Sequence, residues 1–136
     1  PTGVMIAPVI PGLNDEEIPA LLAAAAEAGA RHAGFVVLRL PHGVAGLFED
    51  WLAAHYPGKR DRVLDRLRAL RGGQLYDASY GNRMRGTGPF ADLIRQLFER
   101  GCQRAGLRLG GGFVLSTAQF RRPLGDARQP GLADDW

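Results

Sequence analysis

The sequence predicts an α/β fold in which two parallel strands are joined by a crossover helix. Two short apolar runs, residues 4–10 and 35–40, end at Pro11 and Pro41 and predict strands, and the first has the composition of a strand buried on both faces. Between them, residues 18–25 carry apolar side chains at helical spacing. A strand, a helix and a second strand in this order predict a right-handed βαβ unit with parallel strands.

Several residues of the βαβ unit predict where its first strand and its helix begin, end or become irregular. Pro8 has no amide hydrogen, so it predicts a bulge or an irregular end in the first strand. Asn14, followed three residues later by Glu17, predicts a capping box at the start of the helix. Pro19 would cost an early hydrogen bond of that helix, and Gly29 supplies its stop.

The rest of the chain predicts helices and loops. Residues 44–55 are expected to form a helix with Leu47, Trp51 and Leu52 on one side, and residues 59–70 another. After a glycine-rich stretch, 71–88, Pro89 begins a strongly amphipathic helix that ends near residue 106.

Its apolar face is expected to contain the following residues: Phe90, Leu93, Ile94, Leu97 and Phe98. We therefore divide the chain into a βαβ unit at 1–41, a helical region at 42–108 and an irregular tail at 109–136.

Two strands and one helix cannot shield both edges and both faces of a sheet. The chain begins at Pro1 and enters an apolar run almost at once. We therefore expect it to be the carboxyl-terminal part of a longer enzyme, with further strands upstream; processing or tag removal is the alternative.

The composition excludes several classes of protein and of site. No apolar run reaches the roughly 18 residues of a membrane span, and the single cysteine, Cys102, permits no internal disulfide and no cysteine-only metal site. A cytoplasmic location is the expectation. Residues 55–108 carry twelve Lys/Arg against five Asp/Glu, a net charge of +7. This basic stretch indicates a phosphate-bearing partner or, as the simpler explanation, a solvated helical face.

Ligands of parallel α/β proteins gather at the carboxyl ends of the strands. Here those ends contain Gly12, which lets backbone approach a ligand, and Arg39, a charge in an apolar run. A buried arginine needs a partner, so Arg39 predicts either a structural ion pair or a clamp for a carboxylate or phosphate.

The glycine-rich stretch is the second candidate. It combines arginines and tyrosines in a non-periodic loop, and Tyr76, Asp77, Arg83 and Arg85 are its candidate substrate-binding residues. The alternative is an ordered Ω-loop held together by its own side chains. The three histidines have no metal-ligand spacing, and Cys102 is expected to be a buried structural thiol.

Three segments together resemble the radical S-adenosylmethionine (radical SAM) proteins, in a bacterial branch near the spore photoproduct lyases. They are VMIAPVIPGLND from Val4, GARHAGFVVLRLP from Gly29, and RGG-x-x-YD-x-x-YG-x-R-x-RG-x-GPFA from Arg71. The resemblance extends to about Phe120. It implies that the chain supplies the last two parallel strands of a partial (βα)6 barrel, followed by the helical carboxyl-terminal region.

The resemblance also implies cofactors. A 4Fe-4S cluster would cleave S-adenosylmethionine reductively to a deoxyadenosyl radical, but the family's three cluster cysteines are not in this chain, so the missing amino-terminal half would be its partner. Matching positions predict S-adenosylmethionine contacts at Ala7, Pro8, Val9, Leu38 and Leu40; Asn14 and Arg39 are added from their place at the strand ends.

Three classes of function remain open at this point. The first is part of a radical SAM enzyme, lyase-like or related, inactive in isolation, whose substrate is expected to be a nucleic acid or another large molecule. The second is a non-catalytic module that binds nucleic acid through its basic helices and the loop of arginines and tyrosines. The third is a scaffold domain of an α/β protein with no functional site in this stretch. No membrane partner is expected.

Overall fold

The computed structural model describes residues 2–76, 78, 82–110 and 116–121 of the 136-residue chain. The elements, in chain order, are β1 (Gly3–Val9), the 3-10 turn η1 (Asp15–Glu17), α1 (Ile18–Glu27), β2 (His32–Val37), α2 (Val44–His55), α3 (Arg60–Ala69), α4 (Asn82–Arg85), α5 (Pro89–Ala105) and β3 (Arg108–Leu109).

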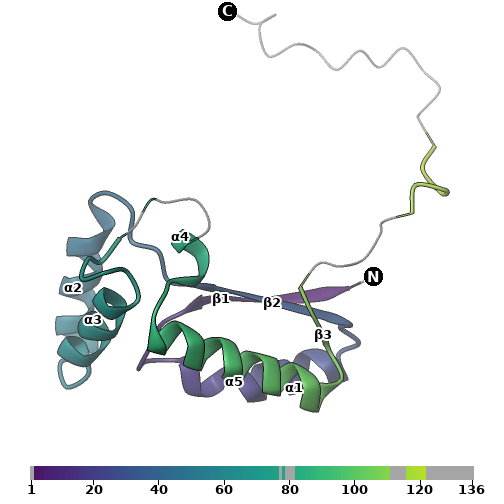
Figure 1. Ribbon diagram of the computed structural model, residues 1–136, viewed down its shortest axis with the longest axis horizontal. Coiled ribbons are helices and arrows are strands. Elements are labelled where there is room, and N and C mark those ends of the chain that lie inside the picture. The colour runs from purple at the N-terminus through teal and green to yellow at the C-terminus, as the bar shows by residue number, and fades with distance from the viewer. Residues whose placement is uncertain (1, 77, 79–81, 111–115, 122–136) are drawn as a thin grey trace, which may run out of the picture.

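The sheet has three parallel strands in the order β1-β2-β3 (Figure 1). The parallel pairing of β1 with β2 confirms the strand–helix–strand prediction. The two-residue strand β3 was not predicted, because residues 108–109 are too short a run to show periodicity. Its amide groups nevertheless extend the sheet, since Arg108 N donates to Arg31 O and Gly110 N to Ala33 O, both at 2.9 Å.

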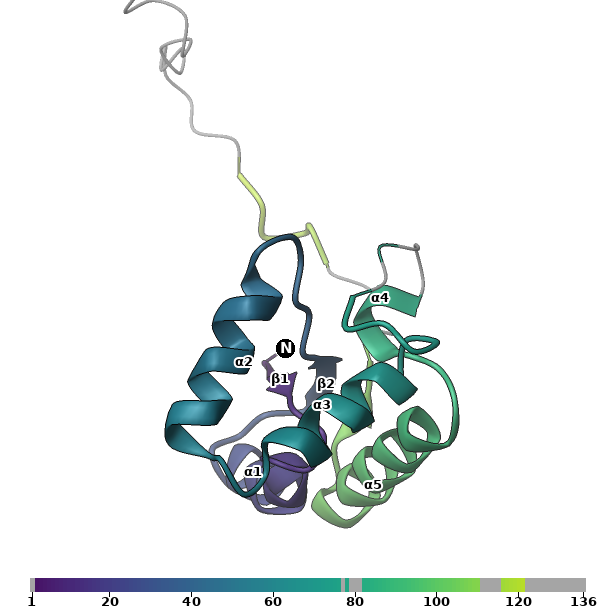
Figure 2. The ribbon, with the colours of Figure 1, turned by 90° about the vertical axis from the view of Figure 1, so that its left-hand side faces the viewer.

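Helices α1 and α5 lie together on one face of the sheet (Figures 1 and 2). The main core lies between this helix pair and the strands, where Ile6, Val9, Leu22, Val37 and Phe98 are buried. The opposite face of β1 is open, with the Met5 side chain 63% exposed. The prediction that the first strand is buried on both faces was therefore wrong.

A second core cluster lies where β1 and β2 end. Helices α2 and α3 pack together there (Figure 1, left), and they bury Leu52 and Leu67 with Leu40 from the segment after β2. β2 ends at Val37, and Leu40 is buried in this second cluster rather than in the sheet. The expected second strand, residues 35–40, is therefore displaced toward the amino terminus.

The first strand is irregular as Pro8 predicted. Its register with β2 shifts between Ile6 and Val9, and the Ala7–Pro8 peptide bond is cis. The predicted capping box is absent, since helix α1 begins only at Ile18, with Glu17 at its cap and no side-chain cap. Pro19 consequently lies in the first turn, where amides have no helical partner, and costs no hydrogen bond. Gly29 ends the helix with a positive φ of 93°, as expected.

The predicted helix bounds after residue 41 are confirmed to within one or two residues, but the buried faces differ. On α2, Leu52 is buried while Leu47 and Trp51 are exposed. On α5, Ile94 and Phe98 are buried as predicted, whereas Leu93 is 59% exposed.

The buried face of α5 consists instead of small and large residues together: Ala91, Ile94, Phe98, Gly101 and Cys102. Within the described ranges, no helix is both long and apolar enough to cross a membrane.

Candidate binding site at the strand ends

The two long strands end side by side. Beyond the last paired residues, Leu38 N donates to Val9 O at 2.9 Å, so the segment after β2 stays attached to the end of β1. The predicted cofactor-binding residues are thereby brought to one end of the sheet, although they differ in what they can offer. Ala7 and Pro8 are exposed, whereas the side chains of Val9 and Leu40 are 1% exposed and available only through their backbone.

Asn14 holds the turn after β1. Its Oδ1 accepts from Ile10 N at 2.7 Å and its Nδ2 donates to Pro8 O at 3.1 Å. Gly12 N in turn donates to Asp15 Oδ1 at 2.9 Å. Asn14 therefore neither caps the helix nor presents its amide to a ligand; it fixes the backbone that a ligand would meet.

Arg39 is half-buried at the same end. Its Nη1 lies 3.7 Å from Met84 Sδ of α4, a weak contact, and its buried Nε has no hydrogen-bond partner among the described residues. No carboxylate in the described part of the chain forms an ion pair with it. Of the two predictions for Arg39, the structural ion pair is thus not found, and the ligand clamp stays a prediction.

Arg71 is a positioning residue that the sequence reasoning did not single out. It is 5% exposed, and its Nη2 donates to Leu38 O at 2.7 Å. The first arginine of the RGG pattern thus supports the backbone at the end of β2. Its place at the start of the motif, after a helix with buried Leu67 and Leu70, was the available signal.

A second missed contact comes from α3. Arg66 Nη1 lies 3.7 Å from Asp15 Oδ2, and its guanidinium lies 5.4 Å from the Phe90 ring centroid. Gly12 has φ +83°, and a Cβ on it would come within 2.9 Å of Arg66 Nη1. The turn after β1 is therefore held between its own hydrogen bonds and a guanidinium from a distant helix.

The predicted substrate-binding loop is described only in part. Tyr76 is half-buried, and Arg85 at the end of α4 is exposed. Asp77 lies outside the described residues, as does the side chain of Arg83. The short helix α4 lies over the end of β2 (Figure 1), so Arg85 comes close to the sheet.

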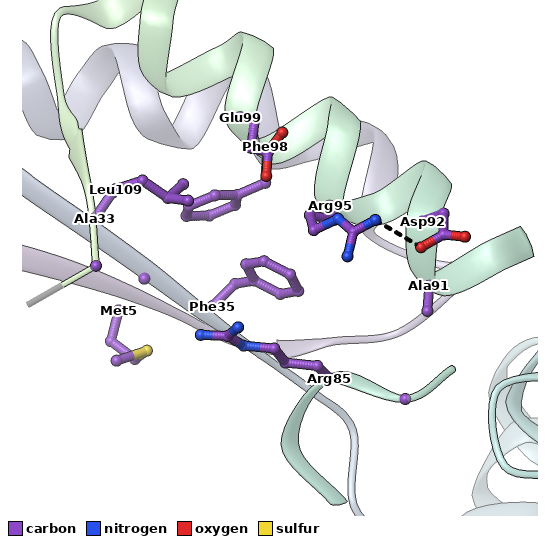
Figure 3. Close-up of a pocket in the computed structure, with 13 residues that line it drawn as sticks. Met5, Ala33, Phe35, Arg85, Ala91, Asp92, Arg95, Phe98, Glu99 and Leu109 are labelled. Carbon is purple, nitrogen blue, oxygen red and sulfur yellow. Dashed lines mark hydrogen bonds and ion pairs between the residues drawn. The ribbon is translucent and has the colours of Figure 1, made fainter. Parts of the chain in front are cut away.

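Arg85 borders a cavity of about 470 Å³ beside β2 (Figure 3). Its apolar walls include Phe35 and Phe98, whose ring centroids are 4.7 Å apart. Arg95, Asp92 and Glu99 of α5 complete the polar part of its lining.

Metal-ligating groups do not gather in the described part of the chain, where no cluster of three His, Cys, Asp or Glu side chains could hold an ion. Cys102 is buried in the helix layer as predicted. Burial raises the pKa of its thiol, and the negative charge of Glu99 raises it further. A protonated, enclosed thiol is a poor cluster ligand.

No protein-family model matches the chain, and no curated protein or solved structure matches it either. The structure and the sequence motifs are therefore the basis for the function proposed below.

Proposed function

We propose that this chain is the carboxyl-terminal part of a radical SAM enzyme and forms the last two strands of its partial barrel. The proposal rests on the motif resemblance and is supported by one structural observation above the others. The carboxyl ends of β1 and β2 are tied together by the bond between Leu38 N and Val9 O, while the described residues leave the Met5 side of β1 open, opposite the face that α1 and α5 cover. A sheet covered by helices on its outer face alone is what a barrel segment requires.

The residues at the strand ends are suited to hold S-adenosylmethionine. Ala7 and Pro8 offer exposed apolar surface for the adenine. The backbone of Leu38 is hydrogen-bonded to Val9, the residue that follows them. The guanidinium of Arg39, whose Nε has no partner among the described residues, suits the carboxylate of the methionyl part. When bound next to a reduced cluster, S-adenosylmethionine would supply the radical that abstracts hydrogen from the substrate.

The cluster itself does not fit this chain. Three closely spaced thiolates are needed, and the sequence has only Cys102, enclosed in the core. We assign to the described residues the binding and orientation of S-adenosylmethionine, and to the rest of the polypeptide the electron-transfer centre.

The test uses the complete polypeptide, reconstituted anaerobically with iron and sulfide. With a reductant and S-adenosylmethionine, it is expected to release 5′-deoxyadenosine. Ala7→Phe, which places a ring over the strand end, is expected to weaken S-adenosylmethionine binding by about tenfold or more. Ala23→Phe, on the exposed side of α1, is the matched control and should bind as the parent does.

The isolated chain is expected to take up no iron in the same reconstitution. A complete polypeptide without a cluster, or one that carries a cluster but releases no 5′-deoxyadenosine, would refute the proposal.

A nucleic acid is the substrate class that the charge distribution favours. Seven exposed arginines form no ion pair with another described residue: Arg31, Arg62, Arg85, Arg100, Arg104, Arg108 and Arg121. If the chain is instead a non-catalytic binding module, the complete polypeptide will bind single- or double-stranded oligonucleotides without producing 5′-deoxyadenosine. In either case, the affinity should fall steeply with added salt.

A further inference from the structure

A pocket of about 340 Å³ opens between the turn after β1 and the side of α3. Helix α3 lies beside the starts of α1 and α5 there (Figure 2). The volume lies within the size range of small-molecule pockets, so a polar group and part of the molecule that carries it can enter. None of the residues assigned to S-adenosylmethionine lines this pocket. Five of its lining residues are charged: Asp15, Glu16, Lys59, Arg62 and Arg66.

The three cations come from one side of α3 and its amino-terminal cap. Lys59, Arg62 and Arg66 follow one another at intervals of three and four residues, which places them in a line along the helix. The neighbouring side of α3, with Val63 and Leu67, is buried in the second core cluster. This burial fixes the rotation of α3 and holds the line of cations at the pocket.

Arg66 is already engaged and forms one wall of the pocket. Its Nη1 lies 3.7 Å from Asp15 Oδ2, and its guanidinium lies 5.4 Å from the Phe90 ring centroid. Asp15 Oδ1 also accepts a hydrogen bond from Gly12 N at 2.9 Å. The charge of Asp15 is therefore largely offset within the protein, and this carboxylate opposes an anion in the pocket only weakly.

Lys59 and Arg62 are the cations of the lining that remain available. Their side chains form no hydrogen bond or ion pair with another described residue. Lys59 is half-buried and Arg62 is exposed. Against them stands the carboxylate of Glu16, which is exposed and likewise has no ion-pair partner among the described residues. Two available cations thus face one available carboxylate.

This balance selects an anionic ligand. A cation would meet three positive side chains, and a neutral apolar ligand would have to remove water from them without replacing it. A phosphate group carries up to two negative charges and accepts hydrogen bonds from several directions, so an ammonium and a guanidinium group can bind it together. A carboxylate offers one charge and acceptors in one plane.

We propose that the pocket between the turn after β1 and α3 binds a phosphate group, with Lys59 and Arg62 as the residues that contact it. Arg66 contributes positive charge from the wall, and Glu16 weakens the binding. The phosphate belongs to a phosphomonoester or to the phosphodiester backbone of a nucleic acid, two sources that the experiment separates. Binding requires neither cluster nor S-adenosylmethionine, so the inference stands or falls separately from the proposed function.

The first probe is inorganic phosphate, titrated against the full chain by calorimetry in mildly alkaline buffer at constant ionic strength. Acetate is the carboxylate control, and phosphate is expected to bind about tenfold more tightly because it carries more charge. Lys59→Gln and Arg62→Gln should each weaken phosphate binding by about tenfold, since each removes one charge-assisted hydrogen bond.

Two further variants test the sign and the place of the effect. Glu16→Gln removes the opposing carboxylate and should tighten phosphate binding about two- to fivefold. Arg104→Gln removes an exposed arginine of α5 that does not line the pocket, and it should bind phosphate as the parent does. Melting temperatures equal to that of the parent establish that the variants are folded.

Two short oligonucleotides of one sequence, with and without a 5′-phosphate, identify the source of the phosphate group. Tighter binding of the 5′-phosphorylated strand, with the difference lost in Arg62→Gln, assigns a phosphomonoester. Equal binding of both strands, weakened alike by Arg62→Gln, assigns the phosphodiester backbone.

A folded chain that binds no phosphate would overturn the proposal. So would equal affinities for phosphate and acetate, and so would a loss in Arg104→Gln as large as that in Arg62→Gln. Phosphate binding that is unchanged or weaker in Glu16→Gln would also contradict it.

Discussion

The two faces of the sheet are built from alternate residues of the same strands, yet they have different surroundings. On one face, Ile6, Val9 and Val37 pack against α1 and α5 and are almost fully buried. On the other face, Met5 is 63% exposed and lies against Gly34. The nearly continuous apolar composition of β1 therefore does not mean that both of its faces are covered in this chain. The covered face supplies the burial that holds these strands, whereas the described residues leave the Met5 side of β1 open.

The largest effect is expected from neighbouring residues on opposite faces of β1. Ile6→Ala removes buried atoms that the helix layer cannot replace, and should lower the free energy of unfolding by about 2–4 kcal/mol. Met5→Ala removes an exposed side chain and should change it by no more than about 0.5 kcal/mol. Denaturant unfolding of both variants measures the difference.

If the two substitutions destabilise the chain equally, the Met5 side of β1 is covered in solution and the comparison of the two faces fails. The same result would weaken the assignment of this sheet to the outer-covered wall of a barrel.

Features that depend on interactions close in sequence were mostly predicted correctly, whereas features that depend on contacts distant in sequence were not. Helix bounds depend on local signals, and the starts at Val44 and Pro89 and the stop before Gly106 were predicted from them. Buried faces depend on distant partners. Trp51 is exposed because α3 packs against the side of α2 that carries Leu52, and nothing within residues 44–55 specifies which side α3 will contact.

The candidate site shows the same division. The end of β1 could be predicted to within one residue because Pro11 and Gly12 follow it, whereas β2 ends at Val37, three residues before the end predicted from Pro41. The uses of individual side chains could not be predicted, since Asn14 was available both for a helix cap and for the preceding loop, where Ile10 N and Pro8 O bind it. Arg71 reaches Leu38 O across 33 positions of sequence, a contact that no local pattern encodes.

Two glycine-to-alanine substitutions test the packing of α1 against α5, because they should change the stability in opposite directions. A Cβ on Gly101 of α5 would lie 2.6 Å from Leu22 Cδ1 of α1, whereas a Cβ on Gly46 of α2 meets nothing within 4 Å. Gly101→Ala should destabilise by about 1–2 kcal/mol, because overpacking outweighs the gain in helix propensity. Gly46→Ala should stabilise by about 0.5–1 kcal/mol through propensity alone. Thermal melts of the two variants should move in opposite directions; a stabilised Gly101→Ala chain would mean that α1 and α5 are not closely packed.

The smallest expected effect is a change in the free energy of unfolding with pH, caused by the buried thiol of Cys102. Burial, and then the charge of Glu99, raise the pKa of Cys102 in the folded chain, so the folded state holds its thiol proton more tightly than the unfolded state. The resulting stabilisation is fully present below the unfolded thiol pKa of about 8.5 and is lost as the pH rises toward and through the higher folded value. Urea midpoints of the parent should therefore fall with pH in this alkaline range more than those of Cys102→Ala, which is less stable at neutral pH but has no thiol to ionise. Parallel pH profiles for the two proteins would mean that water reaches Cys102 and that the layer between the sheet and α5 is not closed.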